Sequence, residues 1–188
     1  MIYFVLLVGG LLRLINLDQS LWLDEGITAQ TVRSFSFIQL ITEFPKFDLH
    51  PPGHYLLLSF WTAIFGISEI SLRVPSLVMG LITIFLMWKI GVEMSSKKVA
   101  LIAAWLLAIN PLHIYYSQEA RMYSMGTMVV LLNFYYFHRL LKYGSWLGYS
   151  LSTVLVLVTD YIIYFSFISQ LLMCGVLFWW GCRLGCYF

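Results

Sequence analysis

Seven apolar runs constrain the fold of this chain more than any other feature. A helix of about 20 apolar residues crosses the hydrocarbon core of a membrane, and fewer suffice when end residues reach the interface. The chain is 61% hydrophobic and 11% charged, whereas an average soluble domain is about 25% charged. We therefore expect an all-α, polytopic transmembrane helical bundle. The runs lie at about 1–17, 53–67, 74–92, 99–116, 122–137, 146–159 and 161–181.

Basic residues in the loops predict which runs cross the membrane, because they favour the cytoplasmic side. The pair Lys97 and Lys98, the pair Arg139 and Lys142, and Arg183 share one side if every run from 74 onward crosses. With a cytoplasmic N-terminus, the run 74–92 then enters from outside only if 53–67 does not cross.

This argument predicts one transmembrane module over residues 1–188. It has a first helix at 1–17, a long external segment at 18–73 and five further spanning helices within 74–181. About six helices would span, and 26–44 and 53–67 would be helices at the membrane interface. In the alternative, 53–67 is a simple transmembrane helix, and Glu119 and Arg121 lie on the opposite face from Asp24 and Glu25.

The predicted topology gathers the acidic residues on the outer side. Acidic residues contribute little to membrane orientation, so we interpret their clustering as functional. The basic residues are scattered, which gives no indication of nucleic-acid binding. Of the nine acids only Glu93 falls elsewhere; the outer eight are Asp18, Asp24, Glu25, Glu43, Asp48, Glu69, Glu119 and Asp160.

The adjacent pair Asp24 and Glu25 is the first candidate for chemistry. A carboxylate near an apolar boundary loses solvation, which raises its pKa and suits it to act as a base. The alternative is that both acids only cap a helix that begins there, where the helix dipole favours negative charge. The spacing of the residues does not choose between Asp24 and Glu25.

Three cations could bind an anionic ligand on the same side. His50 precedes two prolines, which fix the backbone, and it could equally be a polar boundary residue. Arg121 precedes an apolar run, where positive charge opposes the helix dipole; a bound phosphate would compensate, as would a salt bridge to Glu119. Arg73 also precedes an apolar run and could bind a phosphate there, or it could instead anchor its helix at the lipid headgroups.

Asp160 lies between the last two apolar runs. A charge in so apolar a stretch is by default a functional candidate, although Asp160 could also mark a tight external turn. The cysteines Cys174, Cys182 and Cys186 lie in or beside an apolar run, and we interpret them as ordinary membrane-helix residues. We expect neither a metal site nor a cofactor.

These motifs, in this order, resemble the polytopic glycosyltransferases of the GT-C fold that use polyprenyl-phosphate sugars. That family includes the protein O-mannosyltransferases and the bacterial aminoarabinose transferases. The resemblance covers residues 10–165 and rests on Asp24-Glu25, His50-Pro51-Pro52, Leu72-Arg73-Val74-Pro75-Ser76, Asn110-Pro111 and Gln118-Glu119-Ala120-Arg121-Met122-Tyr123.

The resemblance implies transfer of a sugar with inversion, from a polyprenyl-phosphate donor to a lipid, glycan or protein acceptor. Asp24, beside Glu25, would be the base, and Arg121, Arg73 and His50 would bind the donor phosphate. It implies an integral membrane enzyme, in a prokaryotic plasma membrane, with its active side external or periplasmic. The other site candidates are Glu119, Gln118, Tyr123 and Asp160.

The chain departs from the family pattern in two ways. Relatives often have histidine where this chain has Asp160. Family members are also much longer, so the 188 residues are predicted to be an N-terminal portion, to which a second chain could supply helices. The alternative is a truncated, non-catalytic membrane subunit or remnant that binds polyprenyl lipid or a partner.

Overall fold

The computed structural model describes residues 1–46, 48, 50–161, 163–166 and 168–173, and every regular element in these residues is a helix. The predicted all-α class is therefore confirmed. The elements are α1 (Ile2–Leu14), α2 (Leu23–Ser34), α3 (Phe37–Thr42), the 3₁₀ turn η1 (Phe44–Lys46), α4 (Gly53–Phe65), α5 (Glu69–Met94), α6 (Lys97–Ala108), α7 (Pro111–Ser117), α8 (Tyr123–Tyr143) and α9 (Trp146–Thr159).

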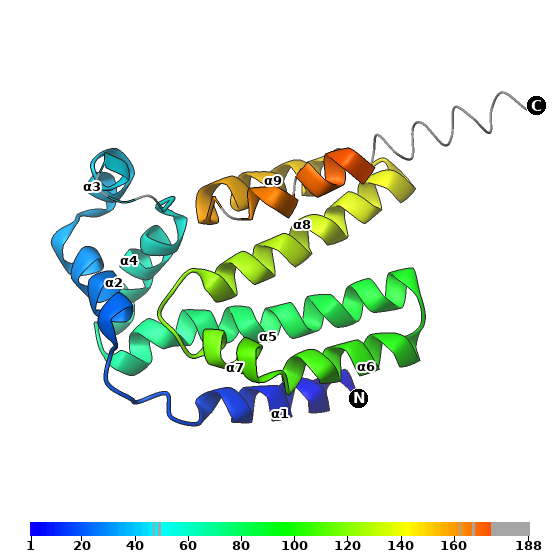
Figure 1. Ribbon diagram of the computed structural model, residues 1–188, viewed down its shortest axis with the longest axis horizontal. Helices are drawn as coiled ribbons and strands as arrows, with labels where there is room; N and C mark the ends of the chain where they lie inside the picture. The colour runs from blue at the N-terminus through cyan, green and yellow to red at the C-terminus, as the bar shows by residue number, and fades with distance from the viewer. Residues whose placement is uncertain (47, 49, 162, 167, 174–188) are drawn as a thin grey trace, which may run out of the picture.

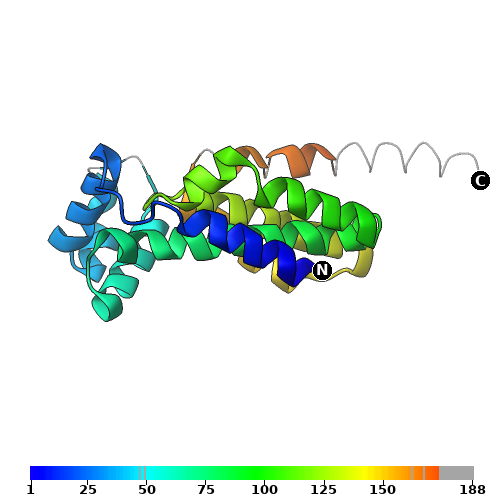
Figure 2. The same cartoon turned by 90° about the horizontal axis from the view of Figure 1, so that it is seen from below.

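The long helices form a bundle, and the short helices of the 18–73 segment gather at one end of it. Figure 1 shows α1, α5, α6, α8 and α9 running side by side, with α2, α3 and α4 at the left. We call this end the head. The N-terminus and the α5–α6 and α8–α9 turns lie at the opposite end, and Figure 2 gives the same arrangement from below.

The head also contains the start of α8, so the 118–122 turn lies at the same end as α2 and α4. α4 does not run the length of the bundle. That 53–67 does not cross the membrane stays a prediction. Which end faces outward stays a prediction.

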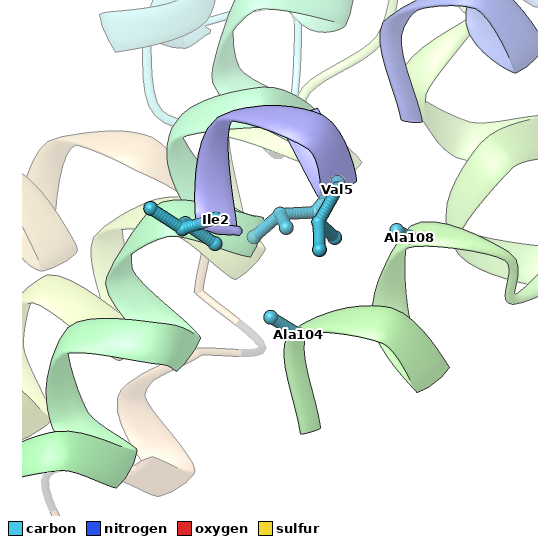
Figure 3. Packing of buried hydrophobic residues seen from close by; sticks show 5 residues of the cluster. Ile2, Val5, Ala104 and Ala108 are labelled. Carbon is cyan, nitrogen blue, oxygen red and sulfur yellow. The ribbon is translucent and has the colours of Figure 1, made fainter. Parts of the chain in front are cut away.

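The core between α1, α5 and α6 depends on small side chains. Ile2 and Val5 of α1 lie beside Ala104 and Ala108 of α6, as Figure 3 shows, and Ile84 of α5 completes the buried cluster. Alanine lets the helix backbones approach closely, as is common where helices pack within membranes.

A break separates α6 from α7, so the predicted run 99–116 is not one straight helix. Asn110 caps α7 and Pro111 occupies its first turn, and the two helices meet at 63°. The break leaves the Ala108 carbonyl without a helical partner, and the buried Arg13 of α1 donates to it at 3.0 Å. Arg13 Nη2 also lies 2.6 Å from His113 Nδ1, which ties α1 to α7.

The described helices do not confirm about six spans. By length and composition α5 could cross a membrane, and the bent pair α6 and α7 could form a second span. α1, α4 and α9 have 13, 13 and 14 residues, and 14 residues rise only about 21 Å against the about 30 Å of a hydrocarbon core. Of the last predicted run, 161–181, residues 162, 167 and 174–181 lie outside the described residues, and so do all three cysteines.

α5 begins earlier than its proline suggests. Ser68 caps it by accepting from the Ser71 N–H, so Arg73 lies inside the helix and not ahead of it. Pro75 cannot donate to the Ser71 carbonyl four residues before it. Trp61 of α4 donates to that carbonyl at 2.9 Å, which joins α4 to α5.

The predicted interfacial helix over 26–44 is two helices. α2 ends at Ser34, and Ser36 starts α3 with a capping box that it forms with Gln39. The turn between them lets α2, α3, η1 and α4 enclose one apolar core, made of Val32, Leu40, Phe44, Tyr55 and Leu58.

Candidate functional site

A buried ion pair between Glu25 and Arg73 holds the head together. Arg73 Nε lies 2.8 Å from Glu25 Oε1 and Nη2 lies 2.5 Å from Oε2, and the Glu25 side chain is 0% exposed. The other Arg73 N–H groups donate to the carbonyls of Leu17, Gln19 and Ser20. A guanidinium has five N–H donors, and here all five are occupied.

The Glu25 carboxylate is equally saturated. Besides Arg73, it accepts from the Ala120 N–H at 2.8 Å and from the Trp22 N–H at 3.4 Å. Burial alone would raise the pKa of Glu25, but the hydrogen bonds from Arg73 and Ala120 outweigh it, so the pKa lies below its ordinary value. Glu25 is thus a fixed anion with no free position for a substrate proton.

The ion pair brings Asp24 and Arg121 together. Asp24 directly precedes Glu25 in the first turn of α2, and Arg121 directly follows Ala120, whose N–H Glu25 binds. One carboxylate therefore positions both neighbours. Arg121 Nη2 lies 3.9 Å from Asp24 Oδ2, which is beyond hydrogen-bonding distance, and the Asp24 side chain is 35% exposed.

Arg121 retains donor capacity in a buried setting. Its Nη1 lies 3.4 Å from Thr28 Oγ1, and its guanidinium lies 6.0 Å from the Tyr123 ring centroid. Its Nε is buried and has no hydrogen-bonding partner. Burial and the nearby Arg121 lower the pKa of His54 to about 4, so this imidazole is neutral at pH 7. Arg121 is thus suited to bind an anion.

His50 is engaged next to α4. Its Nδ1 lies 2.6 Å from Asp48 Oδ1, and its backbone N–H donates to the same oxygen at 2.8 Å. The pair is partly exposed, and its Nδ1 is not available to a ligand in this state. Asp160 is the C-cap residue of α9 and is buried at the head end.

The 118–122 turn carries two further predicted residues. The Gln118 side chain donates to the Ile15 carbonyl at 2.6 Å and so fixes the exit of α1. Glu119 is buried, its Oε2 has no hydrogen-bonding partner, and burial raises its pKa. Hydrogen bonding with the Tyr115 hydroxyl lowers the pKa of Glu119 against the effect of burial, but it leaves Oε2 without a partner, whereas both oxygens of Glu25 are occupied.

A polar cavity of about 400 Å³ opens beside the ion pair. Glu25, Arg73, Gln118 and Glu119 line it. It also contains residues that the sequence did not single out: Asn16, Gln19, Ser20, Trp22 and Tyr115. Within the described chain there is no group of three or more His, Cys, Asp or Glu that could hold a metal ion.

Thr28 was also missed by the sequence argument. It lies four residues after Asp24, on the same face of α2, and that spacing was a usable signal. Trp22 had no comparable signal, because its place beside the cavity depends on how residues 16–25 and 115–119 come together.

The head therefore sets a partly exposed carboxylate, Asp24, against a buried arginine, Arg121. Residues 49–180 match the dolichyl-phosphate-mannose-protein mannosyltransferase family, and the chain belongs to that family. Its members are membrane glycosyltransferases of the GT-C type. No curated protein and no solved structure matches the chain.

Proposed function

We propose that this protein transfers a sugar from a polyprenyl-phosphate donor to a lipid, glycan or protein acceptor, with inversion, at the outer face of the membrane. Asp24 is the base in this proposal and Arg121 binds the donor phosphate. The observation that carries it is the opposition of these two side chains at 3.9 Å, one partly open and one buried.

The choice of Asp24 over Glu25 follows from their hydrogen bonds. Glu25 accepts from four N–H donors, and a base needs a free lone pair that points at the acceptor. Asp24 is the partly exposed member of the pair. We assign Glu25 and Arg73 the role of positioning residues, since Arg73 has no donor left for a phosphate.

In the proposed reaction Asp24 takes the proton of the acceptor hydroxyl while the acceptor oxygen forms a bond to the anomeric carbon of the sugar. The bond from that carbon to the phosphate oxygen breaks, and polyprenyl phosphate leaves with the electron pair. Negative charge grows on the phosphate in the transition state, and a fixed cation such as Arg121 lowers that barrier. His50 would contribute only after release from Asp48.

The test is transfer of labelled mannose from polyprenyl-phosphate mannose by the full chain in membranes. We expect Asp24→Asn to abolish transfer at unchanged expression. Asp18→Asn is the matched control, since Asp18 is an exposed acid just before the same helix. Full activity of Asp24→Asn would refute the base assignment. Binding of the donor without transfer by the unmodified chain would favour a non-catalytic polyprenyl-binding subunit.

A further inference from the structure

The polar cavity beside the ion pair has the lining of a binding site for a neutral ligand. The charges of Glu25 and Arg73 cancel, every donor of Arg73 is occupied, and the third charged residue of the lining is the acid Glu119, which would repel an anion. No other arginine or lysine lines it among the residues described. A phosphate would therefore find no cation here, and an apolar lipid chain would have to desolvate the polar lining.

The remaining lining residues match the chemistry of a sugar ring. Asn16 and Gln19 contribute amides and Ser20 a hydroxyl, which are groups that donate to and accept from sugar hydroxyls. The Gln118 NH₂ donates to the Arg13 and Ile15 carbonyls, so Gln118 contributes its amide oxygen as an acceptor. Trp22 and Tyr115 add aromatic surface with a polar edge. The volume of about 400 Å³ is at the small end of ligand sites, which run from about 300 to 1,000 Å³.

Glu119 gives an independent sign that a ligand belongs there. Its side chain lines the cavity, the residue is 5% exposed, and its Oε2 has no hydrogen-bonding partner. A buried carboxyl oxygen without a partner costs free energy that a ligand hydroxyl would recover. A site that hydrogen-bonds a hydroxyl also rejects ligands that lack it.

We propose that the cavity lined by Trp22, Glu119 and Gln118 binds the ring of a neutral sugar, held by hydrogen bonds to its hydroxyls. The assignment rests on the proposed function for the source of that ring, which is either the donor sugar or a sugar of the acceptor. Glu25, which lines the cavity, directly follows Asp24 in the first turn of α2, so the cavity lies one residue along the helix from the proposed base.

Binding can be measured without turnover, on the full chain in nanodiscs, by saturation-transfer NMR with methyl α-mannopyranoside as the probe. We expect saturable binding that weakens about tenfold in Trp22→Ala and in Glu119→Ala, the loss of one good contact each. Glu119→Gln keeps a hydrogen-bonding side chain and should retain most of the affinity, which separates lost contacts from misfolding.

Two matched controls lie outside the cavity. Trp146 is 69% exposed at the start of α9, at the end of the bundle away from the head, and Glu43 is an exposed acid after α3. Trp146→Ala and Glu43→Ala should bind the probe like the unmodified chain. The proposal is overturned if the unmodified chain does not bind the probe, if the cavity variants bind it undiminished, or if inorganic phosphate displaces it.

Transfer kinetics distinguish the source of the ring and separate the two proposals. Trp22→Ala should raise the KM for the donor if the cavity holds the donor sugar, and the KM for the acceptor if it holds an acceptor sugar. Probe binding without any transfer would leave the cavity assignment intact and refute the proposed function. Transfer with both KM values unchanged in Trp22→Ala would refute the cavity assignment and leave the proposed function intact.

Discussion

Replacing Glu25 with glutamine should destabilise the head far more than its small change in shape suggests. Each carboxylate oxygen accepts from two of the four N–H donors, so the amide keeps one acceptor oxygen and its NH₂ faces the other two donors. Removing one partner of a buried pair costs about 3–5 kcal/mol. We expect the lower end, about 3 kcal/mol, because Arg73 keeps three carbonyl acceptors.

For a chain of this size that loss corresponds to a fall in unfolding temperature of about 6–12 °C. The assay is thermal unfolding of the purified protein in detergent, followed by tryptophan fluorescence. Asp24→Asn is the matched control and should change stability by less than about 1 kcal/mol, since Asp24 is partly exposed. Glu25→Gln combined with Arg73→Met should recover part of the loss.

The same pair predicts a pH dependence. The folded-state pKa of Glu25 lies below its ordinary value of 4.5, so its stabilisation is present above pH 4.5 and is lost as the pH falls through the folded pKa. Glu25→Gln should remove this acid sensitivity. An unfolding temperature of Glu25→Gln equal to that of the unmodified chain at pH 7 would refute the positioning role.

Three further predictions concern other parts of the head and bundle. Arg121→Lys should lower the transfer rate about 10²–10³-fold while the free energy of unfolding changes by less than about 1 kcal/mol. A loss of unfolding free energy large enough to explain the lost activity would assign Arg121 a structural role. Glu119→Gln should unfold at a higher temperature than the unmodified chain at pH 7 but not at pH 4. The reason is that the pKa of Glu119 is raised in the folded protein, so its ionisation lowers the free energy of unfolding as the pH rises above 4.5. A difference in unfolding temperature that does not depend on pH would contradict this. Gly80→Ala should cost about 1–3 kcal/mol of unfolding free energy, since its new methyl overlaps the Ser117 side chain, whereas Gly26→Ala meets no atom within 4 Å and should stabilise α2.

Sequence reasoning was most successful for features that depend on local patterns. The apolar runs predicted an all-helical chain, and Asp24 and Glu25 do lie in the first turn of a helix. It was less successful with span lengths, because hydropathy does not show where a helix breaks. The Asn110-Pro111 break divides one predicted run into α6 and α7, and α1 stops at Leu14.

The roles of the two adjacent acids could not be read from the sequence. Glu25 is saturated by Arg73, 48 residues away, and by Ala120, 95 residues away, whereas Asp24 receives neither contact. Only the tertiary arrangement distinguishes them. Arg73 is the same case: alone it resembles a phosphate-binding arginine, but its five donors are already occupied within the head.

The most direct test of the central claim is a double-mutant cycle on kcat/KM for sugar transfer, with Asp24→Asn, Arg121→Lys and the double variant. If both residues serve one reacting centre, their effects are not additive, and the double variant should be little worse than the worse single variant. Losses that multiply independently, at unchanged stability, would contradict a site in which Asp24 and Arg121 act together.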